Sequence, residues 1–226
     1  MTKALAALLL LAAMASAQPD TALYYVSFLR PAADRPTLAK EDGERLQSAH
    51  MAHIRKMAAD GYLVSAGPFD DTPTTISGIF IMKAVSIEEA RRIANQDPTI
   101  AAHRNTIDVH SWRGPKGIGD EYFRLHKADP KTPEGMGLHP IAFLRPGPGW
   151  KGNEIHIDQV VNGLKANGKL VAGGRIEGEP DFKAILIFNR IPLKDAMQLM
   201  TAAAADTLVP EFHQFYSAAH VFPWNQ

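Results

Sequence analysis

The tetrapeptide Phe28-Leu29-Arg30-Pro31 recurs unchanged as Phe143-Leu144-Arg145-Pro146 in the second half of this 226-residue chain. In each half it ends a run of residues typical of a β-strand, and a stretch with helical spacing of its apolar residues follows. Four glycines also keep the same six-residue spacing in the two halves: Gly61 and Gly67, and Gly168 and Gly174. Repeated spacing of turn residues indicates an internal duplication.

Both halves are expected to contain the element order βαββαβ. In the first half the pattern predicts strands at 21–30, 62–66, 75–85 and 106–112, and helices at 43–60 and 86–96. In the second half it predicts strands at 139–145, 169–172, 181–190 and 213–222, and helices at 153–167 and from 192 onward. Ser86 and Glu89 form a capping-box pattern at the start of one helix. Residues 114–137 show no hydrophobic period and are interpreted as a linker.

This order predicts an α+β fold made of two tandem ferredoxin-like domains, residues 20–113 and 138–226. Both faces of each sheet carry apolar residues, so the second face needs a cover. Two copies can supply it by packing sheet on sheet, which gives an intramolecular pseudo-dimer similar to a dimeric α+β barrel. A higher oligomer stays open.

The N-terminus has the pattern of a secretory signal peptide. One positive charge at Lys3 precedes the apolar run Ala4–Met14, and Ala15-Ser16-Ala17 forms a cleavage motif. The apolar run is too short to span a bilayer. Residues 1–17 are therefore expected to be removed after Ala17, which places the mature protein in the periplasm or outside the cell, with no membrane attachment.

Composition excludes several classes of function. The chain has 24 Lys and Arg residues against 24 Asp and Glu residues, so capture of nucleic acid or of an anionic membrane by net charge is not supported. It has no cysteine, which excludes disulfides, cysteine nucleophiles and cysteine-bound zinc.

His50 and Asp97 are the first candidates for chemistry. His50 falls on the first helix and Asp97 falls just before Pro98, after the second helix, and these elements pack side by side in a βαββαβ sandwich. A carboxylate bonded to an imidazole fixes the tautomer of the ring and raises its basicity, which suits a general base or acid. The alternative is that Asp97 caps a turn and His50 is a surface residue.

The first half resembles the YCII-related (YciI-like) family. The resemblance rests on His50, on Gly61, on the strand end Leu63-Val-Ser-Ala-Gly-Pro68, on Ser86-Ile-Glu-Glu-Ala90 and on Asp97-Pro98. It implies a ferredoxin-like fold, dimeric packing of sheets, and a site built from His50 and Asp97. Some relatives act on small ring compounds, and most have no established reaction.

The second half departs from the family pattern. Counting back from Gly174 reaches Ile157, next to His156, and counting back from Trp224 reaches Val209 where the first half has Asp97. The second domain is therefore interpreted as a degenerate copy that supports the fold and shapes the pocket of the first.

Further residues complete the prediction. Ser65 and His53 are candidate substrate-binding residues. His50 and His53 share a helix face and could ligate a metal with His103 or Asp97 as a third ligand, but most such pairs are not ligands, and neither a metal nor a cofactor is expected. The leading hypothesis is a cofactor-independent lyase, isomerase or dehalogenase for a small organic molecule. The alternatives are a non-catalytic module that binds a small ligand and a structural interaction domain.

Overall fold

A computed structural model describes residues 20–70, 75–178, 181–204 and 206–224. The first half contains β1 (Thr21–Pro31), α1 (Lys40–Ala59), β2 (Leu63–Pro68), β3 (Gly78–Met82), α2 (Ile87–Ala94), α3 (Pro98–Ala101) and β4 (Asn105–Pro115). After α4 (Asp120–Ala128), the second half contains β5 (Gly137–Pro146), α5 (Glu154–Ala166), β6 (Leu170–Glu177), β7 (Ala184–Phe188), α6 (Leu193–Ala204) and β8 (Leu208–Ser217). The predicted signal peptide, residues 1–17, lies outside the described residues.

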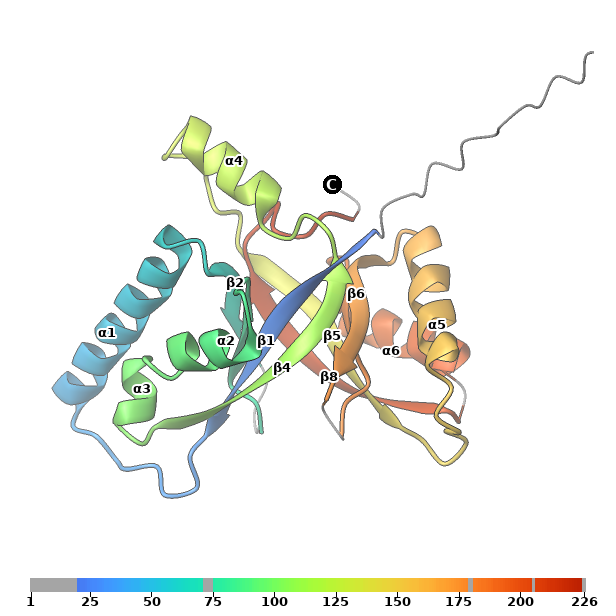
Figure 1. Cartoon of the computed structure of the whole chain (residues 1–226), viewed down its shortest axis with the longest axis horizontal. Coiled ribbons are helices and arrows are strands. Elements are labelled where there is room, and N and C mark those ends of the chain that lie inside the picture. Colours follow the sequence, from blue (N-terminus) through green and yellow to red (C-terminus); the bar gives the residue numbers. More distant parts are fainter. Residues whose placement is uncertain (1–19, 71–74, 179–180, 205, 225–226) are drawn as a thin grey trace, which may run out of the picture.

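The eight strands form one antiparallel sheet in the order β2-β3-β1-β4-β6-β7-β5-β8. Two seams join the halves. At the first, β4 pairs with β6 over three residue positions. At the second, β2 and β8 meet near a single bridge between Phe69 and Phe215, and the backbone N–H of Asp70 donates to Gln214 O at 2.8 Å. Because its two edge strands come together, the sheet curls toward a barrel, with α1–α3 on one side and α5 and α6 on the other (Figure 1). The α+β class and the antiparallel sheet predicted from the sequence are confirmed.

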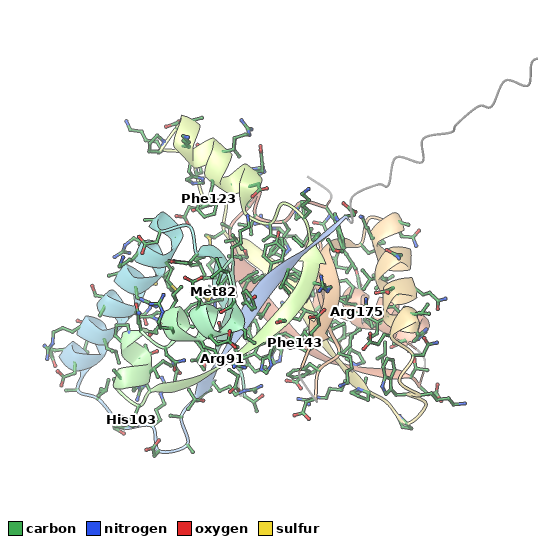
Figure 2. The ribbon with its side chains drawn as sticks, in the orientation of Figure 1. Met82, Arg91, His103, Phe123, Phe143 and Arg175 are labelled. Carbon is green, nitrogen blue, oxygen red and sulfur yellow. The ribbon has the colours of Figure 1, made fainter. Side chains whose placement is uncertain are left out.

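The core has three parts because alternate strand residues point to opposite faces of the sheet. Residues from both halves fill the interior of the curled sheet, among them Phe28, Trp112, Phe143 and Phe215. Figure 2 shows Phe143 between the two groups of helices. Separate apolar clusters lie beneath α1–α3 and beneath α5 and α6. Within the described ranges, no helix is both long and apolar enough to span a membrane.

The two glycine pairs have matching positions. Gly61 and Gly168 follow α1 and α5 with φ of 81° and 65°, the left-handed conformation that ends many helices. Gly67 and Gly174 lie at the two seams. A Cβ on Gly67 would overlap the carbonyl oxygen of Tyr216, and a Cβ on Gly174 would overlap that of Arg113. Both seams therefore require glycine on one strand.

Several predicted elements need correction. The interval 114–137 is not only a linker, since it contains α4 and parts of β4 and β5. The closing strand of the second half is Leu208–Ser217, not 213–222, so Val221 and Phe222 lie beyond it and pack into the barrel core. The strand predicted at 75–85 is shorter, Gly78–Met82, and all five of its residues are buried. The Ser86 cap is confirmed, since the Glu89 N–H donates to Ser86 Oγ at 3.2 Å, but the Glu89 carboxylate accepts from the N–H of Val85, at 2.9 Å, one residue before the cap.

Candidate functional site

Helix α1 stands away from the sheet along most of its length. Met57, near its C-terminal end, is its one fully buried residue. A groove of about 1200 Å³ opens between α1, the strands β2 and β3, and α4. This volume exceeds that of most small-molecule pockets, which are roughly 300–1000 Å³. The groove is the candidate binding site of the first half.

His50 lies in this groove, and the structure joins it to Asp97. Its Nδ1 is 2.6 Å from Asp97 Oδ2. The His50 side chain is 15% exposed and the Asp97 side chain is fully buried. The imidazole also stacks on Phe80, with 6.1 Å between ring centroids and an angle of 26° between the planes. The pairing that the sequence suggested is therefore present, with one ring nitrogen facing the acid.

Asp97 lies beyond the C-terminal end of α2, which is Ala94. It is the N-cap of the short helix α3, directly before Pro98 at the first helical position. Its Oδ1 accepts from the backbone N–H of Thr99 at 2.8 Å and from Thr99 Oγ1 at 2.7 Å. Asn105 Nδ2 in turn donates to Thr99 Oγ1 at 3.1 Å. Burial by itself would raise the pKa of Asp97, but the hydrogen bonds from His50 and Thr99 outweigh it, and the pKa falls below its ordinary value.

The hydrogen bonds around Asp97 fix the tautomer of neutral His50. An ionised carboxylate only accepts hydrogen bonds, so Nδ1 must carry a proton and donate it to Asp97. Nε2 is then the unprotonated nitrogen, and it has no hydrogen-bond partner within the described part of the chain. A basic nitrogen is thus held in the wall of the groove with its lone pair free.

Ser65 also borders the groove, without bonding to either residue. It lies opposite Ile81, which points into the barrel, whereas Ala66 lies opposite Phe80, the residue beneath His50. Directly opposed residues share a face of the sheet, so Ser65 and His50 approach the groove from different faces of β2. Ser65 Oγ is buried and finds no hydrogen-bond partner among the described residues.

His53 is not brought to the groove. It borders a separate pocket of about 240 Å³ with Lys56 and Asp60. Burial lowers the pKa of His53, partly offset by the nearby Asp97 carboxylate. Within the part of the chain that the structure describes, no group of three or more His, Asp or Glu side chains is arranged to hold a metal ion.

The second half has a different contact at the corresponding helix. His156 on α5 bonds through Nε2 to Thr207 Oγ1 at 2.8 Å, and this hydroxyl donates to Ala204 O at 2.6 Å. The hydroxyl therefore accepts from His156, and Nε2 is occupied by a proton. Val209, which counting from Trp224 matched with Asp97, instead lies within β8 opposite Arg145. That count was wrong because Trp224 lies beyond the closing strand.

Sequence reasoning missed several groove residues. Thr99 and Asn105, which orient Asp97, carry no motif beyond the Asp-Pro pair of a capped helix. On α4, Tyr122 and Phe123 border the groove, and Figure 2 shows Phe123 on this helix. The part-buried residues Tyr122, Leu125 and His126 have the spacing i, i+3, i+4 of one helix face, but these few residues are a weak signal among the surrounding glycines and prolines.

Comparison with known proteins places the His–Asp pair within a recognised domain. Residues 26–113 match the family model of the YCII-related domain. The YCII-related domain thus contains His50, Ser65 and Asp97, and ends in β4. A Bacillus subtilis (strain 168) protein named "Uncharacterized protein YjpA" is 27% identical over 66 residues, which cover 29% of this chain and 74% of that protein.

Solved structures extend the similarity of fold beyond the YCII-related domain. A variant chlorite dismutase from Candidatus Nitrospira defluvii has a TM-score of 0.57 at 10% identity, covering 88% of this chain and 92% of that chain. A second structure, of a candidate chlorite dismutase, has a TM-score of 0.51 at 11% identity, covering 87% and 94%. At these identities the likeness concerns the fold alone, which is that of chlorite dismutase-like α+β barrels.

Proposed function

We propose that the groove beside α1 is a small-molecule site in which His50 moves a proton and Asp97 orients it. The observation that carries the proposal is the geometry of the imidazole: Nδ1 is bound to a buried carboxylate at 2.6 Å, and Nε2 is free in the groove. The reaction class is that of a cofactor-independent lyase, isomerase or dehalogenase acting on a small organic molecule.

Each residue of the site has its own role in the proposed proton transfer. Nε2 of His50 takes a proton from the bound molecule, and the ring becomes a cation. The Asp97 carboxylate stabilises that cation, and the hydrogen bonds from Thr99 keep it ionised and in place. The same nitrogen can return the proton at another atom of the ligand or to its leaving group. General acid–base catalysis of this kind contributes about 10²–10⁴-fold in rate. Ser65, which borders the groove, is proposed to contact a ligand oxygen.

A non-catalytic binding module is the second candidate. One observation favours it: Asp97 caps α3, so the acid also has a structural role that needs no reaction. Chlorite dismutase activity is not proposed, because the resemblance to those enzymes is limited to the fold.

A ligand screen with His50→Asn separates the two candidates. The asparagine amide can still donate to Asp97 from the position of Nδ1, while the basic Nε2 is removed. Phenols, lactones and carboxylic acids are screened by thermal shift, since a ligand at 100 times its Kd adds about 2.7 kcal/mol of stability. Molecules that bind are then incubated in D₂O, and their conversion or carbon-bound deuterium is measured by NMR. The matched control is His103→Asn, an exposed residue with φ of 51°, a conformation that asparagine tolerates.

We expect the parent and His103→Asn to convert or exchange a bound molecule about 10²–10⁴-fold faster than His50→Asn. Binding to all three proteins with neither conversion nor exchange in any would establish a non-catalytic module. If nothing in the panel binds the parent, the small-molecule proposal fails.

We also propose that the two halves are copies of one ferredoxin-like unit, forming an intramolecular pseudo-dimer with the second copy degenerate. The matching glycine positions at helix ends and seams support this. So does a repeated ion pair: Arg30 lies 3.0 Å from Asp108 on β4, and Arg145 lies 2.8 Å from Glu211 on β8. In this view the second copy provides half of the barrel core and one border of the groove.

Export remains part of the proposal, and it rests on the signal-peptide pattern of residues 1–17. The intact mass of the protein recovered outside the cytoplasm should match that of a chain that begins at Gln18. A retained Met1 in that fraction would contradict cleavage after Ala17.

A further inference from the structure

The groove carries a strong excess of positive charge, although the chain as a whole has none. Among the residues that the structure describes, four cationic side chains border it, Arg35, Lys40, Arg55 and Arg104, against one carboxylate, Glu134. The chain has equal numbers of acidic and basic residues, so this excess is local. A concave surface lined by one sign of charge attracts ligands of the opposite sign.

Two of these cations lie together at one end. Arg104 Nη1 donates to the carbonyl of Pro36, which places its guanidinium beside Arg35. The proximity shows in the pKa of Arg35, which burial and the charge of Arg104 both lower. Arg35 makes no side-chain hydrogen bond or ion pair within the described ranges, and no carboxylate there pairs with Arg104. Two adjacent guanidiniums without an acid partner have the donor geometry that binds carboxylates.

The end of the groove that holds the two arginines is connected through the backbone to the His–Asp pair. Arg104 follows α3, and its backbone N–H donates to Thr99 O at 2.9 Å, so the same short segment holds Arg104 and the residue that orients Asp97. Arg35 lies in the loop between β1 and α1. Both guanidiniums therefore enter the groove at the N-terminal end of α1, and His50 lies further along that helix.

The opposite end of the groove is lined mainly by aromatic and apolar side chains. Tyr122 and Phe123 of α4 border it, together with Met136 and Tyr216. The acid at this end among the described residues is Glu134, and burial, together with the charge of Glu134 and the hydrogen bond that Tyr122 donates to it, raises the pKa of Tyr122. Figure 1 shows α4 at the end of α1 that is remote from the β1–α1 loop. A 20-residue helix is about 30 Å long, so the two ends are well separated.

We propose that the groove binds an elongated organic anion, with its carboxylate between Arg35 and Arg104 and its apolar or aromatic body directed toward Tyr122 and Phe123. This inference rests on the proposed small-molecule site and gives its substrate class. Glu134 repels a carboxylate at the far end, so the charges also fix the direction in which the ligand lies. From the arginine end, the body of the ligand runs along α1 toward His50 Nε2.

The test compares a charged ligand with its neutral counterpart. Binding of 6-phenylhexanoate and of 6-phenylhexanamide is measured by titration calorimetry on the parent, on Arg35→Gln and on Arg91→Gln. Arg91, labelled in Figure 2, is an exposed residue of α2. It is not among the residues that border the groove, so its variant makes the same change in charge elsewhere in the same half.

We expect the parent to bind the carboxylate at least about tenfold more tightly than the amide, because a hydrogen bond from a guanidinium to a charged oxygen is stronger than one to a neutral amide. Arg35→Gln should lose about tenfold in affinity for the carboxylate and leave the amide unchanged, while Arg91→Gln should match the parent. Equal affinity for both ligands, equal losses in the two variants, or no binding of either ligand at millimolar concentration would overturn the inference.

The experiment separates this inference from the proposed function. Exchange that depends on His50 but shows no preference for the carboxylate would overturn the anion end alone. Binding that depends on Arg35 without chemistry that depends on His50 would keep the ligand class and remove the proposed reaction.

Discussion

Gly174→Ala is expected to lower the free energy of unfolding by about 3 kcal/mol, the upper part of the usual range for overpacking a well-filled core. The added Cβ would overlap the carbonyl oxygen of Arg113, which is backbone on the facing strand and has no rotamer to escape into. The clash falls on the β4–β6 seam, beside the hydrogen bond from Trp112 Nε1 to Gly174 O at 3.1 Å. Urea denaturation measures the loss.

Gly163→Ala is the matched control in the same half. Gly163 lies inside α5, and a Cβ there meets no atom within 4 Å. Alanine is favoured over glycine in a helix by about 0.5–1 kcal/mol, so this variant should be more stable than the parent. If Gly174→Ala were as stable as Gly163→Ala, the halves would not be joined at this seam as described.

Asp97→Ala is expected to cost about 2–4 kcal/mol of stability. Loss of the α3 cap accounts for about 1 kcal/mol, and the hydrogen-bonding groups of Thr99 and His50 left unpaired account for about 1–3 kcal/mol more. Asn153→Ala removes a comparable cap from α5 that has no histidine partner, and it should cost only about 1 kcal/mol.

A double-mutant cycle isolates the contact itself. Asp97→Ala, His50→Ala and the double variant should show a coupling of about 1–3 kcal/mol, because residues in one hydrogen-bond network are not additive. Additive effects would show that the two residues stabilise the fold independently, and the pair would then lose its special role.

Much of the fold follows from local sequence signals. Glycines after helices, the repeated Phe-Leu-Arg-Pro and alternating apolar residues predicted most elements and the antiparallel sheet. Errors arose where context decides. Helix α4 has too few apolar residues to stand out between glycines and prolines, and it becomes clear only when Tyr122 packs against His126, with 4.1 Å between ring centroids. The C-terminal residues Val221 and Phe222 are apolar, as buried strand residues are. They are buried in the structure, but they pack into the core from outside the strand.

The site was predicted in part, for a physical reason. His50 and Asp97 could be paired because a βαββαβ order brings their elements together. The tautomer could not be predicted, because it depends on which ring nitrogen faces the acid, and in the structure Nδ1 lies 2.6 Å from Asp97 Oδ2. The pairing of Arg35 with Arg104 brings a loop together with the start of a distant strand, a tertiary contact that leaves no periodic trace in the sequence.

The tautomer of His50 tests the central claim most directly. Long-range ¹H–¹⁵N correlation spectra of histidine-labelled protein, recorded where the ring is neutral, distinguish a proton on Nδ1 from one on Nε2. The account predicts that His50 carries its proton on Nδ1 in the parent, and that Asp97→Asn, whose amide can donate to Nδ1, shifts the ring toward the other tautomer. A proton on Nε2 in the parent, or a spectrum that Asp97→Asn leaves unchanged, would contradict it.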